Sequence, residues 1–206
     1  MKKDTKFIYR LNGGLYVNLT NRCCNDCVFC LRRNGDGIKG DTLWLEREPS
    51  ASEVVDAIKA AGFQYGEVVF CGYGESTYRV PEIVEISRYV RPLGKTTRLN
   101  TNGLGNLING RDIVPDLKGN VDAVSVSLNE SDAARYAALC RPAYGLDAYP
   151  AILDFCRRCV CAGINTVMTV VDVIPPAEIE KCRESARLVG ARLRVRRRIN
   201  NNNDYT

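Results

Sequence analysis

Hydrophobic positions along the chain change repeatedly between strand-like and helix-like spacing. Short apolar or β-branched runs predict strands at 15–19, 67–71, 98–100, 122–128, 166–171 and 193–196. Between these runs, apolar residues recur three or four positions apart, which predicts helices at 51–62, 80–92, 131–139, 148–162 and 176–189. A shorter helix with a break at Pro115 is expected at 110–118, and a glycine- and arginine-rich loop at 31–49. About six such strand–helix units predict an α/β fold with a parallel sheet.

The composition narrows the possible chemistry. A chain of 206 residues with 45% hydrophobic content suits one domain with a sizeable core, and a net charge of +5 is too small to indicate nucleic-acid binding. There is no histidine, which excludes Ser-His-Asp hydrolases, His-ligated zinc and a histidine general base. The opening residues lack the apolar segment of a signal peptide, and no apolar run is long enough to span a membrane. We therefore expect the ten cysteines to be reduced thiols in the cytoplasm.

Three cysteines directly after the first predicted strand form the strongest motif. Cys23, Cys27 and Cys30 have the spacing C-x3-C-x2-C, and the aromatic Phe29 precedes the last of them. Thiolates are soft ligands that suit iron–sulfur clusters, but three of them leave one iron of a four-iron cluster open. An open iron indicates reactive chemistry. A structural zinc domain is the alternative, although zinc usually takes four ligands and no fourth stands nearby in a suitable spacing.

Polar residues follow several of the predicted strands. The groups that carry function in parallel α/β folds gather at the carboxyl ends of the strands. The cysteine loop lies at the end of the first strand, and the ends of the next three carry Gly72, Tyr73, Gly74, Glu75, Asn100, Ser127 and Asn129. We expect these side chains to share one site.

These motifs resemble those of the radical S-adenosylmethionine (SAM) superfamily. The cysteine spacing with its aromatic residue is the signature of that family, and residues 72–75 look like its "GGE" turn with Tyr73 inserted. Residues 18–23 and the small size are most similar to the TatD family-associated radical SAM proteins. The resemblance implies a partial (βα)6 TIM-like barrel with a parallel sheet. It implies a single radical SAM core domain over 1–199, followed by a polar tail at 200–206.

The resemblance also implies cofactors and a reaction. Cys23, Cys27 and Cys30 would each ligate one iron of a 4Fe–4S cluster, and the open iron would bind the amino nitrogen and carboxylate of SAM. One electron, from a donor of the flavodoxin or ferredoxin type, would cleave SAM to a 5′-deoxyadenosyl radical. That radical would abstract a hydrogen atom from the substrate.

Other residues would then contact SAM. Gly72 and Gly74 would let the backbone approach its methionine part, and a glycine carbonyl or the Glu75 side chain would receive its ammonium group. Phe29 would contact the adenine or act as a hydrophobic plug beside the cluster. For the strand-end residues, the resemblance implies contacts with the ribose and the methionine carboxylate of SAM. The alternative is that they are ordinary polar groups at the ends of strands. These residues are Asn100, Ser127 and Asn129.

Two further groups of residues are open to interpretation. Cys156, Cys159 and Cys161 suggest an auxiliary cluster, but helical spacing places Cys161 away from the other two, which favours buried thiols. The last strand carries arginines whose alternation puts 192, 194, 196 and 198 on one side. They would bind a phosphate or carboxylate, or form a solvated sheet edge.

The substrate is left open by the sequence. Little chain follows the last strand to cap a barrel, which leads us to expect a large substrate such as a protein or peptide. The alternatives are a small-molecule radical enzyme, for example in nucleoside or cofactor biosynthesis, and a non-catalytic iron–sulfur module for electron transfer or sensing.

Overall fold

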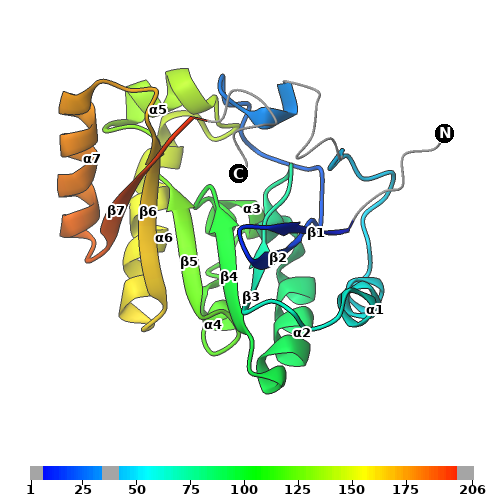
Figure 1. The fold of residues 1–206 in the computed structure, drawn as a ribbon. Coiled ribbons are helices and arrows are strands. Elements are labelled where there is room, and N and C mark those ends of the chain that lie inside the picture. Colours follow the sequence, from blue (N-terminus) through cyan, green and yellow to red (C-terminus); the bar gives the residue numbers. More distant parts are fainter. Residues whose placement is uncertain (1–6, 34–41, 199–206) are drawn as a thin grey trace.

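A seven-stranded sheet organises the chain. The computed structural model describes residues 7–33 and 42–198, and the strands lie in the order in which they occur in the sequence (Figure 1). They are β1 (Ile8–Leu11), β2 (Gly14–Val17), β3 (Glu67–Phe70), β4 (Thr96–Thr101), β5 (Ala123–Ser127), β6 (Asn165–Val171) and β7 (Arg192–Arg196). Strands β2 to β7 are parallel, so the predicted α/β fold with a parallel sheet is confirmed.

Strand β1 was not predicted from the sequence. β1 pairs antiparallel with β2 across a two-residue turn at Asn12 and Gly13, whose φ angles are 48° and 75°. Both residues are therefore left-handed, which is the geometry of the tightest hairpin turns and the reason why Asn-Gly is favoured there. The Asn-Gly pair was the signal in the sequence that would have revealed this hairpin.

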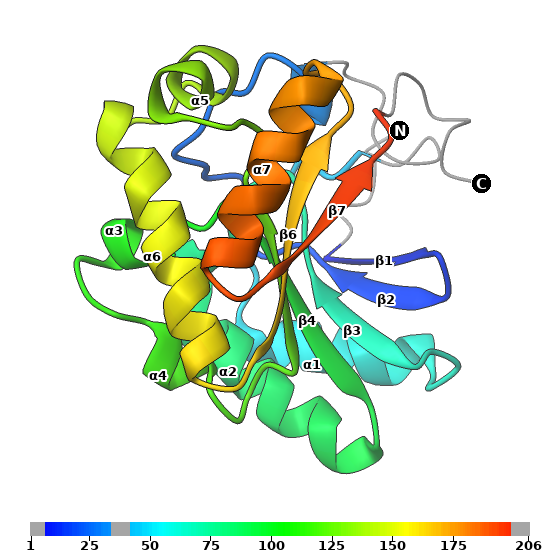
Figure 2. The same cartoon turned by 90° about the vertical axis from the view of Figure 1, so that its left-hand side faces the viewer.

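The helices lie mainly on one face of the sheet (Figures 1 and 2). The main ones are α1 (Ala51–Ala61), α2 (Val80–Val90), α5 (Ala133–Cys140), α6 (Ala148–Cys161) and α7 (Pro176–Leu188). They confirm the five longer predicted helices, with small shifts at the ends. α1 begins with a capping box in which Ser50 accepts from the backbone N–H of Glu53 and the Glu53 carboxylate accepts from that of Ser50.

The prediction for residues 110–118 was partly wrong. Within this range only α4 (Val114–Leu117) is helical, and a separate short helix, α3 (Gly105–Asn109), precedes it and ends at Gly110, whose φ is 63°. Pro115 lies in the first turn of α4 and does not break a helix. Proline lacks a backbone N–H, but this costs no hydrogen bond at that position, because the first N–H groups of a helix have no partner within the helix.

The two faces of the sheet have different environments. Val68 and Phe70 belong to the main core, which lies between the sheet and the helices. Val69 points to the other face, where it joins a smaller cluster with Tyr9 and Tyr16. The period of two along a strand separates these sets. The face away from the helices is thus apolar beside β1 to β3, and it becomes polar towards β7, where the strand is largely exposed.

The predicted loop at 31–49 and the predicted tail at 200–206 include residues outside the described ranges. In the expected loop at 31–49, the structure shows a single 3-10 turn at Leu31–Arg33 and no helix or strand in 42–49. Residues 34–41 and the predicted tail at 200–206 lie outside the described residues. Within the described part of the chain, the helices are too short or too polar to cross a bilayer.

Candidate active site

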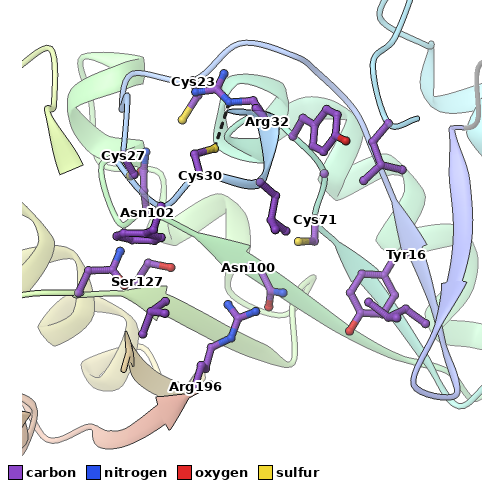
Figure 3. Close-up of a pocket in the computed structure, with 18 of the residues that line it drawn as sticks. Tyr16, Cys23, Cys27, Cys30, Arg32, Cys71, Asn100, Asn102, Ser127 and Arg196 are labelled. Carbon is purple, nitrogen blue, oxygen red and sulfur yellow. Dashed lines mark hydrogen bonds between the residues drawn. The ribbon is translucent and has the colours of Figure 1, made fainter. Parts of the chain in front are cut away.

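A cavity of about 750 Å³ lies on the face of the sheet away from the helices, and it extends to the carboxyl ends of the strands. It is lined by residues of the cysteine loop and of strands across the whole sheet (Figure 3). Most of the predicted site residues line it together, namely Cys23, Cys27, Phe29, Cys30, Gly72, Tyr73, Asn100, Ser127 and Asn129. Gly74 and Glu75 do not line it.

The cysteine loop is held in place by the end of α5. Backbone N–H groups of Asp26 and Val28 donate to the carbonyls of Cys140 and Leu139, at 3.1 and 3.0 Å. The buried Asn25 side chain donates to the Tyr136 hydroxyl, 111 positions along the chain, at 2.7 Å. The loop therefore has a defined shape without a helix or strand of its own.

The loop separates two adjacent cysteines. Cys24 is the neighbour of the predicted ligand Cys23, and it has a C-x2-C spacing to Cys27. In the structure, Cys23 lines the cavity, whereas the buried Cys24 thiol accepts a hydrogen bond from Asn102 Nδ2 at 3.2 Å. All three members of the predicted trio, Cys23, Cys27 and Cys30, thus line the cavity, together with Cys71 from the end of β3.

The three thiols fit an iron–sulfur cluster. All are half-buried, and two of them accept hydrogen bonds: Cys23 Sγ from the Asn25 N–H at 3.5 Å, and Cys30 Sγ from Arg32 Nε at 3.3 Å (Figure 3). Such bonds stabilise thiolates. Among the described residues, no three Cys, Asp or Glu side chains converge on a point that a single metal ion could fill. A four-iron cluster takes each thiolate on a different iron, which suits more widely spaced donors.

Burial favours the neutral form of the Cys23 and Cys27 thiols in the free protein. It raises the pKa of Cys23 to about 12, and the nearby Glu75 carboxylate adds to this effect. The pKa of Cys27 is also raised, first by its hydrogen bond with Cys140 and then by burial. A bound metal centre would reverse this preference, because coordination deprotonates a thiol.

The glycine turn after β3 packs tightly on the chain that leads into the cysteine loop. A Cβ atom at Gly72 would lie 1.9 Å from Asn18 Oδ1, and one at Gly74 would lie 2.3 Å from the Thr20 carbonyl oxygen. These contacts alone require glycine at both positions. The predicted contact of Gly72 and Gly74 with SAM stays a prediction.

Glu75 has a different environment from the one expected. Its buried carboxylate accepts four hydrogen bonds, from the N–H and hydroxyl of Thr77, the hydroxyl of Thr101 and the N–H of Asn102, at 2.6–3.1 Å. Its own backbone N–H donates to the Arg22 carbonyl at 2.7 Å. Burial raises the pKa of the Glu75 carboxyl in spite of these donors. The carboxylate is bonded to the protein on both oxygens, and its predicted contact with the ammonium group of SAM stays a prediction.

The polar strand ends meet as expected. Asn100 Oδ1 accepts from Arg98 Nη1 at 2.8 Å, and Ser127 lies beside it in the cavity wall. Asn129 has a left-handed backbone with φ of 61°, and its Nδ2 lies 3.7 Å from Cys140 Sγ. Sequence reasoning gave no role to Asn102, which lines the cavity and bonds Cys24. Its place at the end of β4 was the available signal.

The cysteines in α6 do not form a second metal site in the described part of the chain. Cys156 and Cys159 are fully buried within the main core, and Cys161 is exposed. This matches the expectation that helical spacing would separate Cys161 from the other two. Packing is the role that this arrangement supports.

Sequence comparison places the chain in a family. The sequence pattern of the radical SAM superfamily matches residues 17–189, and the chain belongs to that superfamily. Its members are enzymes that use a 4Fe–4S cluster and SAM. GTP 3′,8-cyclase from Corynebacterium glutamicum is 29% identical over 187 residues, which cover 82% of this chain and 46% of that protein. GTP 3′,8-cyclase from Mycolicibacterium smegmatis is 29% identical over 157 residues, 74% of this chain and 40% of that protein. The chain thus spans less than half the length of these curated relatives.

Solved structures share the fold. A radical SAM methyltransferase from Sphaerobacter thermophilus has a TM-score of 0.60 at 19% identity, over 92% of this chain and 57% of that one. Streptococcus suis SuiB bound to precursor peptide SuiA has a TM-score of 0.65 at 16% identity, over 93% and 40% of the two chains. Native anSMEcpe with bound AdoMet has a TM-score of 0.64 at 13% identity, over 89% of this chain and 50% of that one.

Replacing Gly74 by alanine should destabilise the protein by about 1–3 kcal/mol, because the new methyl group would meet two backbone carbonyls that cannot move freely. Gly66→Ala is the matched control. A Cβ atom there meets nothing within 4 Å, so its effect should stay within about 0.5 kcal/mol. Urea unfolding monitored by circular dichroism measures both. Equal stability of the two variants would contradict the packing role of Gly74.

Glu75→Gln should also lower the free energy of unfolding, by about 1–3 kcal/mol. Each carboxylate oxygen accepts one backbone N–H, so the amide nitrogen of glutamine would face a donor in either orientation. Glu85→Gln, at an exposed position of α2, should have little effect. An unchanged urea midpoint for the Glu75 variant would show that the four hydrogen bonds do not hold the site together.

Arg32→Gln should make the midpoint potential of the reconstituted cluster more negative, on the order of tens of millivolts. The substitution removes a cation and an N–H donor from Cys30 Sγ, and both favour the more negative, reduced state. Arg33→Gln is the control, because Arg33 donates to the Cys27 carbonyl and to Asp26 and to no sulfur. A redox titration followed by electron paramagnetic resonance should show a larger shift for Arg32→Gln. Equal shifts would mean that only net charge matters.

Proposed function

We propose that the chain is a radical SAM enzyme that acts on a small molecule. When bound, the cluster and SAM supply a 5′-deoxyadenosyl radical, which abstracts a hydrogen atom from the substrate. The observation that carries the proposal is the arrangement of Cys23, Cys27 and Cys30. They are three half-buried thiols that open onto the same cavity as the polar ends of the parallel strands.

The chain's own residues have separate proposed roles. Cys23, Cys27 and Cys30 hold the cluster, and Arg32 donates to one of its sulfur ligands. SAM is expected beside them, against the lining residues Phe29, Gly72, Tyr73, Asn100, Ser127 and Asn129. Glu75 and Gly74 act indirectly, because they fix the turn that carries Gly72 and Tyr73.

A small-molecule substrate is favoured over the protein or peptide that the sequence led us to expect. The curated relatives are named for a reaction of a nucleotide. The peptide-bound neighbour is only 16% identical and supports the fold alone.

Several finer assignments belong to this proposal. The one-sided helices and the cavity on the other face support a partial (βα)6 barrel over 1–199. A flavodoxin- or ferredoxin-type donor would supply the electron. The TatD-associated subgroup and a cytoplasmic location remain predictions from the sequence.

Anaerobic reconstitution with iron and sulfide, followed by dithionite and SAM, should yield 5′-deoxyadenosine. Cys27→Ala should abolish this product, because it removes one of the three cluster ligands. Cys159→Ala, buried in α6 away from the cavity, should retain it. Product formation by the Cys27 variant, or none by the native protein, would overturn the proposal. A SAM-induced change in the electron paramagnetic resonance of the reduced cluster would exclude a module that only transfers or senses electrons.

A further inference from the structure

The cavity has a strong excess of positive charge on the side away from the cysteine loop. Its described lining contains one carboxylate, Glu67, and six arginines: Arg32, Arg98, Arg194, Arg196, Arg197 and Arg198. Four of these arginines lie on β7 or directly after it. The other end of the cavity holds Cys23, Cys27 and Cys30, with Arg32 beside Cys30. Arg196 on β7 and these three thiols therefore lie in opposite parts of it (Figure 3).

The single carboxylate is already paired. Glu67 accepts from Arg98 Nε at 3.0 Å and from Arg98 Nη2 at 2.8 Å, which is a bidentate ion pair. Arg98 is thereby neutralised. Its third contact, to Asn100 Oδ1 at 2.8 Å, extends this rigid group towards the centre of the cavity.

The arginines of β7 have no such partner in the described structure. Arg194 Nη2 lies 3.4 Å from Ser125 Oγ, which is a neutral group. Within residues 7–33 and 42–198, no carboxylate lies within ion-pair distance of Arg194, Arg196, Arg197 or Arg198. This contrasts with other arginines on the surface, many of which pair with a nearby Asp or Glu.

Strand geometry aims two of these arginines into the cavity. Arg194 and Arg196 are two positions apart, so they share a side of β7, and both line the cavity. Leu193 precedes Arg194 and packs against the main core on the other side of the strand. Arg196 points towards Asn100 and Ser127 (Figure 3). The pKa of Arg194 is lowered, first by burial and then by the cations Arg196 and Arg98. The site therefore holds Arg194 and Arg196 close together, with no ion-pair partner for either among residues 7–33 and 42–198.

The number of unpaired charges favours phosphate over carboxylate. A carboxylate carries one charge and pairs with one guanidinium in bidentate fashion, whereas a phosphate monoester carries nearly two and offers three acceptor oxygens. We propose that Arg194 and Arg196 bind a phosphate group of a small-molecule substrate, at the end of the cavity opposite the cysteine loop. Arg197 and Arg198 add positive charge at its rim. This substrate class rests on the proposed radical SAM function.

The competing explanation is a solvated sheet edge guarded by arginines. β7 is the last strand of the sheet, and arginine at such an edge discourages pairing with other chains. Arg192 provides the comparison. It lies on the same strand and is exposed, but it does not line the cavity. An edge guard predicts that Arg192 and Arg194 behave alike, whereas a phosphate site predicts that they differ.

Isothermal titration of the anaerobically reconstituted protein with tripolyphosphate tests the proposal. Arg194→Gln and Arg196→Gln should each weaken binding by about tenfold or more, as expected for loss of a charge-assisted contact. Arg192→Gln should bind within about twofold of the native protein, because the same charge is lost outside the cavity. Tricarballylate, which carries three carboxylates, should bind at least about tenfold more weakly than tripolyphosphate.

Three results would overturn the phosphate site. They are no binding of tripolyphosphate, an equal loss in the Arg192 and Arg194 variants, and equal affinity for tricarballylate, which would assign the site to carboxylates. The same preparation is assayed for 5′-deoxyadenosine, so the two proposals can fail separately. Product without phosphate binding removes the subsite alone. Specific phosphate binding without product supports the subsite and contradicts the SAM chemistry.

Discussion

A single buried carboxylate joins the three strand ends that build the site. Glu75 sits in the turn after β3, its N–H bonds the chain entering the cysteine loop from β2, and its oxygens bond Thr101 and Asn102 at the end of β4. A buried carboxyl group costs several kilocalories per mole unless it is hydrogen-bonded, so all of these bonds must form together. The relative positions of the cysteines, the glycine turn and Asn102 follow from this one constraint.

The same network orders the cysteine loop. Asn102, held by Glu75, donates to Cys24 and keeps that thiol in the core, while its neighbour Cys23 faces the cavity. On the other side, the end of α5 supplies carbonyls to the loop backbone. A segment without regular structure is thus fixed from two sides. This suits a site that must hold three thiolates at set positions, because weakly fixed ligands would have to be ordered when the cluster binds.

The two ends of the cavity differ chemically because the side chains on this face of the sheet change from apolar to cationic between β1 and β7. Beside β1 to β3 the cavity face is apolar and supports the loops that carry cysteines and glycines. Towards β7 the same face carries arginines. In the function proposed above, a substrate would place its charged group at the β7 end and its reacting carbon nearer the cysteines. Recognition and chemistry would then use different parts of one pocket, as is common where strand ends surround it.

The sequence by itself determined the parallel α/β fold, the six parallel strands and the positions of the motifs at their carboxyl ends, because periodicity and chain order depend on local residues. It also identified Cys23, Cys27 and Cys30 as a set. Only the tertiary structure decided that Cys24 turns inward, that Glu75 is bonded to the protein and that Arg194 faces the cavity but Arg192 does not. Each of these features depends on residues far away in the chain. A local sequence pattern does not indicate which distant group will form a hydrogen bond with a buried polar atom.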